Sequence, residues 1–264
     1  MQKNSYTLQN KKDKGKSLRT EQEIWLPVAS GLALLILWLL LAMLVGIPHI
    51  LPSPIDMILR LWELKKVLFL THLPVTLLAV LLGFAASVLI GVLLAVMMDL
   101  SESLEAMLYP VMVLTQTIPV MCIAPLFVLW FGYTMQTRLL AIILSTFFTI
   151  AVNTMDGLKR TNQEVVQLMQ TYGASSWEIF WHIKVPSALP DFMTSLKITF
   201  PWAVVGAAVA EWLGSQEGLG YYSKLMITRM DGPAVFATVL VLSLIAVLGM
   251  NLIKWADRRF VFWR

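Results

Sequence analysis

Apolar residues are grouped along this chain into long blocks with few charged side chains, and short polar segments separate the blocks. The first block, residues 24–45, is long enough to cross a bilayer core of about 30 Å at about 1.5 Å per residue. Further blocks occupy residues 74–98, 108–131, 138–152, 192–213 and 234–255, of which 138–152 is the shortest. The pattern predicts an all-α polytopic membrane protein with about six transmembrane helices.

Residues 52–70 are too short and too charged to add another span. They contain the ionisable residues Asp56, Arg60, Glu63, Lys65 and Lys66. Ser53 followed by Pro54 is a helix-start signal, because proline is tolerated in the first turn of a helix. We therefore expect an interfacial helix on the external surface of the membrane.

A polar and amphipathic island, residues 164–190, lies between the blocks at 138–152 and 192–213 and reads EVVQLMQTYGASSWEIFWHIKVPSALP. Apolar positions such as Trp177 and Trp181 alternate there with polar ones, so a short helix would have one apolar and one polar face. Gly173 divides the island and permits a positive φ between two short helices. The pattern predicts a helical hairpin.

Two prolines, Pro186 and Pro190, stand at the end of the island. The residue before a proline is disfavoured in the α-helical region, so these positions are expected to prevent helix from continuing backwards from the next apolar block. The full prediction for the island is a helix, a sharp turn, a second helix and a stop.

Composition supports a membrane protein independently of the block pattern. Hydrophobic residues make up 58% of the chain and charged residues 14%, whereas soluble proteins have about 25% charged residues. With six spans and the N-terminus inside, most of the 20 lysines and arginines lie on the inner side, together with the island. Cytoplasmic loops are enriched in these residues, so we expect both termini and the island to be cytoplasmic.

Three segments are expected along the chain. Residues 1–21 carry a run of basic side chains with little that could pack, and they predict a disordered basic cytoplasmic tail. Residues 22–73 should form the first transmembrane helix and the external interfacial helix. Residues 74–264 should form the core, with the island at about 164–190.

The island also resembles a known family. Gly173, nine intervening residues, Ile183, one residue, and then Val185 and Pro186 are similar to the G-x9-I-x-L-P signature of binding-protein-dependent ABC importer permeases. The acidic and small residues that open the family motif are absent, because Gln167, Leu168 and Met169 occupy those positions.

The resemblance extends from about residue 51 to the C-terminus. It includes LPSPID near residue 52, QTIPVMCIAPLFVLWFG at 116–132 and AEWLGSQEGLGYY at 210–222. These stretches are most similar to the nitrate, sulfonate, taurine and thiamine-precursor branch. The resemblance implies a multi-pass permease of the bacterial cell membrane that carries a small solute into the cytoplasm.

The family resemblance also implies partners and cofactors. They are an ABC ATPase subunit, an extracytoplasmic solute-binding protein, a second permease copy in a homodimer, and membrane lipid, with no nucleic acid. The chain itself is not expected to be an enzyme: Gly15-Lys16-Ser17 resembles the end of a phosphate-binding loop, but Asn10 stands where its first glycine is required. ATP and Mg are therefore expected on the partner ATPase, with no cofactor in this chain.

Two sets of site residues are expected. The ATPase-coupling set is Gly173, Ala174, Ser175, Ser176, Trp177, Glu178 and Phe180. The substrate-path set, chosen as polar, thioether or aromatic residues within spans, is Gln116, Met121, Asn153, Trp202 and Glu211. No catalytic set is predicted, and the three histidines are too far apart along the sequence to suggest a metal site.

Each set has an alternative reading. The island could be an amphipathic helix lying on lipid headgroups. Glu211 could cap the turn that follows it, and the polar path residues could bond neighbouring backbone. The whole chain could be an ion-coupled secondary transporter or channel driven through Glu211 or Asp156, although six spans without an inverted repeat are few for such a protein.

Overall fold

The computed structural model describes residues 25–261, and that part of the chain contains helices and no strand. The elements are an N-terminal helix Trp25–Val45, α2 (Pro54–Lys66), the π-helical segment η1 (Val67–His72), α3 (Leu73–Leu100), α4 (Glu102–Thr117), α5 (Val120–Phe131), α6 (Met135–Lys159), α7 (Gln163–Thr171), α8 (Ser176–Ile179), the π-helical segment η2 (Phe180–Lys184), α9 (Val185–Gly214), α10 (Leu219–Thr228) and α11 (Gly232–Phe260).

The described residues hold five helices long and apolar enough to cross a membrane, or six if α4 and α5 are one broken span. The predicted all-α class is confirmed, and the predicted number of spans agrees with the larger count. The basic tail predicted at residues 1–21 lies outside the described residues.

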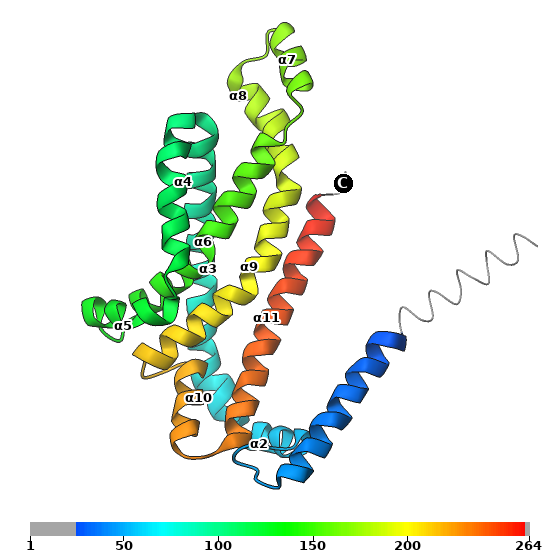
Figure 1. The fold of residues 1–264 in the computed structure, drawn as a ribbon, viewed down its shortest axis with the longest axis vertical. Coiled ribbons are helices and arrows are strands. Elements are labelled where there is room, and N and C mark those ends of the chain that lie inside the picture. The colour runs from blue at the N-terminus through cyan, green and yellow to red at the C-terminus, as the bar shows by residue number, and fades with distance from the viewer. Residues whose placement is uncertain (1–24, 262–264) are drawn as a thin grey trace, which may run out of the picture.

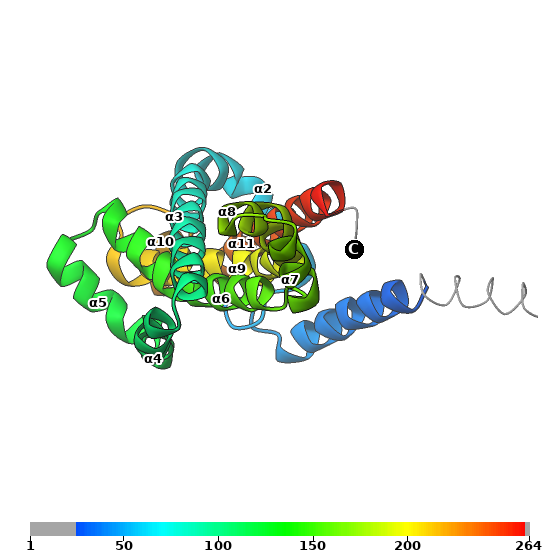
Figure 2. The same cartoon turned by 90° about the horizontal axis from the view of Figure 1, so that it is seen from above.

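The long helices α3, α6, α9 and α11 run along the length of the molecule with α4 beside them (Figure 1). At one end, here named the hairpin end, α7 and α8 project beyond the other helices, whereas α2 and α10 lie at the opposite end. The N-terminal helix diverges from the bundle in both views (Figures 1 and 2). It is joined to the rest near α2, where the Trp38 indole N–H donates to the Pro52 carbonyl oxygen at 3.1 Å.

Helices α3 and α6 pack closely because two glycines of α3 face two isoleucines of α6. A β-carbon at Gly83 would lie 2.8 Å from Ile142, and one at Gly91 would lie 2.8 Å from Ile150. Small residues allow helix backbones to approach closely in membranes, where packing replaces the hydrophobic effect between helices. A larger residue at Gly83 or Gly91 would therefore force α3 and α6 to move apart or the isoleucines to shift.

Helix α6 is ten residues longer than the predicted block at 138–152, since it extends over Met135–Lys159. Polar residues lower the hydropathy of its second half but do not interrupt it. The hydroxyls of Thr146 and Thr154 donate to the backbone carbonyls one turn earlier, at 2.7 and 2.6 Å. These bonds satisfy the hydroxyls inside an apolar helix.

The block predicted as a span at 108–131 is not one continuous helix: α4 and α5 meet at 95° at a break of two residues. Between them Ile118 and Pro119 have extended backbone conformations, with ψ of 118° and 128°. Proline lacks a backbone N–H and disfavours helix at the preceding residue, which explains the break. Two other prolines, Pro110 and Pro125, stay within the helices.

Helix α2 matches the interfacial helix predicted at 52–70, although it continues through η1 into α3. The Ser53 hydroxyl accepts from the Asp56 N–H at 3.1 Å and so caps the first turn. Arg60 binds Asp231, the N-cap residue of α11, at 2.6 Å. The Arg60–Asp231 ion pair holds α2 against the start of α11.

Glu211, near the end of α9, is fully buried. Its Oε2 accepts hydrogen bonds from the Thr76 hydroxyl and from the Gly220 N–H, both at 2.9 Å. Thr76 in turn accepts from the Leu219 N–H at 2.8 Å, and His72 Nδ1 accepts from the N–H of the α10 N-cap residue at 3.2 Å. The first N–H groups of a helix have no partner within it, so side chains from η1, α3 and α9 hold the start of α10.

Replacement of Gly83 by alanine should lower the stability of the bundle, because the new methyl group would overlap Ile142. Overpacking of this kind costs about 1–3 kcal/mol. Thermal unfolding of the purified protein in detergent measures the effect. The matched control is Gly31→Ala, since a β-carbon at Gly31 in the N-terminal helix meets no atom within 4 Å; equal midpoints for the two variants would contradict the close contact.

Replacement of Glu211 by alanine should leave the buried Gly220 N–H without its acceptor and lower the free energy of unfolding by about 1–3 kcal/mol. Glu211→Gln keeps a carbonyl oxygen for the same bonds and should be less harmful. Unfolding midpoints of both variants are compared with that of Glu217→Ala, which removes an exposed carboxylate from the adjacent loop. Equal losses for Gln and Ala would mean that the charge, and not the acceptor, holds α10.

Candidate functional site

The residues selected from the sequence lie mainly at two places: the hairpin, residues 163–184, and a cavity beside the α4–α5 break. In the hairpin, Gly173 has a φ of +84°, as the sequence predicted. The Gly173 N–H donates to the Gln170 carbonyl at 2.9 Å, and the Ala174 N–H donates to the Met169 carbonyl at 3.0 Å. These two bonds form a Schellman turn, which ends α7 and reverses the chain.

Helix α8 begins with a capping box. The Ser175 hydroxyl accepts from the Glu178 N–H at 3.3 Å, and the Glu178 carboxylate accepts from the Ser175 N–H at 2.7 Å. Both side chains are exposed, as are Gly173 and Ser176, whereas Ala174 is half-buried. The polar groups at the start of α8 are thus already bonded to one another, and this fixes the direction of the helix.

An aromatic cluster covers the next turn of the hairpin. The ring centroid of Trp177 lies 6.3 Å from that of Phe180 and 5.5 Å from that of Trp181. Trp177 is 69% exposed and Trp181 49% exposed. Large exposed apolar groups gathered at one place mark interaction sites, so this patch can bind another protein or lipid.

The predicted stop after the second short helix is wrong. From Ser176 the helix continues through η2 into α9 as one helix that ends at Gly214. In η2 the hydrogen bonds reach one residue further back, and the Val185 N–H donates to the Phe180 carbonyl. Pro186 follows directly after this π-turn, so the hydrogen bond that a proline cannot donate is missing at a point where the α-helical bonding pattern is already interrupted. The hairpin is therefore joined rigidly to a membrane-spanning helix.

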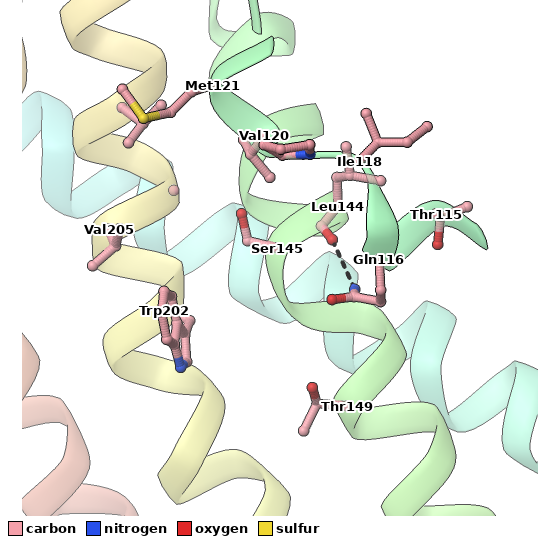
Figure 3. Close-up of a pocket in the computed structure, with 13 residues that line it drawn as sticks. Thr115, Gln116, Ile118, Val120, Met121, Leu144, Ser145, Thr149, Trp202 and Val205 are labelled. Atoms are coloured by element: carbon pink, nitrogen blue, oxygen red, sulfur yellow. Dashed lines mark hydrogen bonds between the residues drawn. The ribbon is translucent and has the colours of Figure 1, made fainter. Parts of the chain in front are cut away.

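The cavity has a volume of about 400 Å³ and lies among the α4–α5 break, α6 and α9 (Figure 3). Its lining residues are Thr115, Gln116, Ile118, Pro119, Val120, Met121, Leu144, Ser145, Thr149, Trp202, Val205, Gly206 and Val209. Three of the five predicted path residues, Gln116, Met121 and Trp202, are among them. These three residues were predicted from the sequence and belong to three separate helices, α4, α5 and α9, which the fold brings together around the cavity.

The lining contains no ionisable side chain. Its polar side-chain groups are hydroxyls, one amide and the Trp202 indole N–H, and the Gln116 Nε2 donates to the Leu144 carbonyl at 3.2 Å (Figure 3). The Trp202 side chain is 58% exposed and presents an indole ring beside these groups. Such a surface can hold a flat, uncharged molecule by stacking and hydrogen bonding.

The other two predicted path residues do not line the cavity. Asn153 lies one turn beyond Thr149 on α6, and its amide donates to the Thr149 carbonyl at 2.7 Å. Glu211 binds α10, away from the cavity and not at the turn 212–214 that it could have capped. Ser145 and Thr149 also line the cavity but were not predicted from the sequence, although with Asn153 they form a polar stripe at i, i+4 and i+8 on α6.

No group of three or more histidine, cysteine or acidic side chains that could hold a metal ion occurs among residues 25–261. The lone cysteine, Cys122, is exposed on α5.

A family model described as "Binding-protein-dependent transport system inner membrane component" matches residues 87–262. The chain is 46% identical over 238 residues to the formylaminopyrimidine transport permease protein ThiX of Halalkalibacterium halodurans, an alignment that covers 90% of this chain and 95% of that protein. It is 36% identical over 230 residues to a probable ABC transporter permease protein of Haemophilus influenzae, with 87% and 94% covered.

Among solved structures, an amino acid ABC transporter matches the fold with a TM-score of 0.61 at 16% identity, covering 74% of this chain and 95% of that one. The inward-facing MetNI methionine ABC transporter matches with a TM-score of 0.51 at 19% identity, covering 77% and 97%. These two likenesses concern the fold alone. The family model covers well over half of the chain, and with the close relatives it shows that the chain belongs to the binding-protein-dependent transport system inner membrane components, as a permease subunit of an ABC transporter.

Proposed function

We propose that this chain forms the solute path of an ATP-driven importer for a flat, uncharged heteroaromatic solute of the aminopyrimidine type. The observation that carries the proposal is the cavity, which offers Trp202 for stacking, Gln116 and hydroxyls for hydrogen bonds, and no charge. The formylaminopyrimidine permease that is 46% identical supports the same class. An ion-coupled mechanism has no ionisable side chain among the cavity residues to work through.

The ATPase subunit is proposed to bind at the hairpin, through Gly173, Ala174, Ser175, Ser176, Trp177, Glu178 and Phe180. The exposed aromatic cluster and the projection of α7 and α8 beyond the bundle support this position (Figure 1). ATP and Mg are then bound by the ATPase and not by this chain. The hairpin end is cytoplasmic in this arrangement, the two chain termini are cytoplasmic, and the solute-binding protein meets the α10 end.

A second copy of the chain is proposed to close the cavity. Trp202 and Met121 are 58% and 56% exposed, so the cavity is a half-site open on one side. Polar Gln116 is exposed on the same side, where contact with lipid would leave its amide incompletely hydrogen-bonded. A two-fold homodimer places two such half-sites opposite one another.

Labelling with a membrane-impermeant thiol reagent tests the orientation. In a Cys122→Ala background, Tyr172→Cys in the hairpin should react only from the cytoplasmic side, because Tyr172 is 80% exposed there. Gln216→Cys, at an exposed position of the α9–α10 loop, should react only from outside. Reaction of both variants from the same side would contradict the proposed topology.

Uptake into proteoliposomes that contain the ATPase and binding protein of the same transport system tests the function. Labelled formylaminopyrimidine should enter only with ATP inside, and taurine should not compete. Trp202→Ala should lower solute uptake at limiting concentration by roughly tenfold, since stacking on an aromatic ring is worth about 1–3 kcal/mol. The control variant Trp255→Ala removes a similarly exposed tryptophan from α11 and should leave uptake unchanged. Uptake of taurine in place of the pyrimidine would overturn the proposed solute class.

A further inference from the structure

Two lysines, one at the end of α6 that leads into the hairpin and one at the last residue of the hairpin, each bind a carboxylate on a neighbouring helix. Lys159, the last residue of α6, binds Glu105 of α4, and Lys184, the last residue of η2, binds Asp99 of α3. Asp99 and Glu105 stand on the two sides of the short α3–α4 turn. The hairpin is thus paired with α3, and the end of α6 that leads into it is paired with α4.

The ion pair with α3 connects the hairpin to the rigid core. Lys184 Nζ lies 3.0 and 2.9 Å from the two carboxylate oxygens of Asp99, and the Asp99 side chain is only 4% exposed. Helix α3 packs on α6 along its length through Gly83 and Gly91. This ion pair therefore joins parts that are already held together.

The ion pair with α4 is different because α4 has little other packing within its own chain. Met112 is the one buried residue of α4, and Ala124 is the one buried residue of α5. A space of about 590 Å³, lined by both ion pairs, separates the base of α4 from the hairpin. Apart from the turn to α3, α4 therefore has room to move at the hairpin end, and its Glu105–Lys159 pair bridges this space.

The other end of α4 leads directly to the solute cavity. Gln116 lies in its last turn, and Ile118 follows at the break with α5; both line the cavity. A displacement of α4 along or about its axis would change the position of these residues relative to Trp202 on α9. A loosely packed helix that connects the hairpin to the cavity is suited to transmit movement between them.

We propose that Lys159 and Glu105 are positioning residues that couple ATPase-driven movement of the hairpin to the α4–α5 wall of the solute cavity. This inference rests on the proposed function, in which the ATPase binds the hairpin. The ion pair stays closed through the cycle, so that α4 moves together with the hairpin, α6 and the helices packed on α6. Loss of the pair leaves ATP hydrolysis intact and reduces the solute carried for each ATP hydrolysed.

The test measures formylaminopyrimidine uptake and ATP hydrolysis in the same proteoliposomes, with the ATPase and binding protein present. Glu105→Gln and Lys159→Gln should each lower the uptake per ATP by roughly threefold to tenfold, with hydrolysis and subunit assembly retained. The exchanged pair, Glu105→Lys with Lys159→Glu, should recover most of the ratio. Arg160→Gln is the matched control, because Arg160 pairs with Asp191 of α9, whose exposure is nearly that of Glu105, and does not touch α4.

A chemical cross-link tests whether the Glu105–Lys159 contact stays closed during transport or must open. In a Cys122→Ala background, Glu105→Cys with Lys159→Cys should be uncoupled, and a short bifunctional thiol reagent that joins the two cysteines should restore uptake per ATP. Abolished uptake after cross-linking, or an unchanged ratio in both glutamine variants, would overturn the proposal. Absence of ATP-driven uptake in the parent protein would instead contradict the proposed function itself.

Discussion

The approach of α3 to α6 through glycine is the contact on which the rest of this structure depends. Because Gly83 and Gly91 have no side chain, the isoleucines of α6 lie almost against the α3 backbone. Gly206 of α9 makes a similar approach, since a β-carbon there would lie 2.9 Å from Ser145 of α6. Three helices thereby form one rigid unit, and the hairpin, the cavity and α10 are all positioned by it.

Hydrogen bonding in an apolar medium imposes the second constraint. Backbone groups at membrane depth must find partners in the protein or line a cavity, and two irregular points of the described residues show the two cases. The start of α10 is held by Glu211 and Thr76, whereas the α4–α5 break is placed beside a cavity. Irregular backbone at membrane depth is tolerated where it lines a cavity, which connects the fold with the proposed solute path.

The sequence predicted those features that depend on neighbouring residues along the chain. The long apolar blocks predicted the spans. Gly173 predicted the hairpin turn, because the positive φ that this turn needs is a property of a single residue. It did not predict that the helix passes Pro186, since the π-turn that permits this is not visible in residue types. The cavity was only partly predicted, because Ser145 and Thr149 become lining residues through the positions of α4 and α9.

The hairpin separates the bonds that shape it from the side chains that it displays. Its turn and its cap are closed by backbone groups, by Ser175 and by Glu178, while Trp177 and Trp181 take no part in those bonds and remain exposed. Natural selection can therefore alter the aromatic face without unfolding the segment that carries it. With the ATPase bound at this face, as proposed, permeases with the same backbone can diverge in the ATPase subunit that each recognises through substitutions at a few positions.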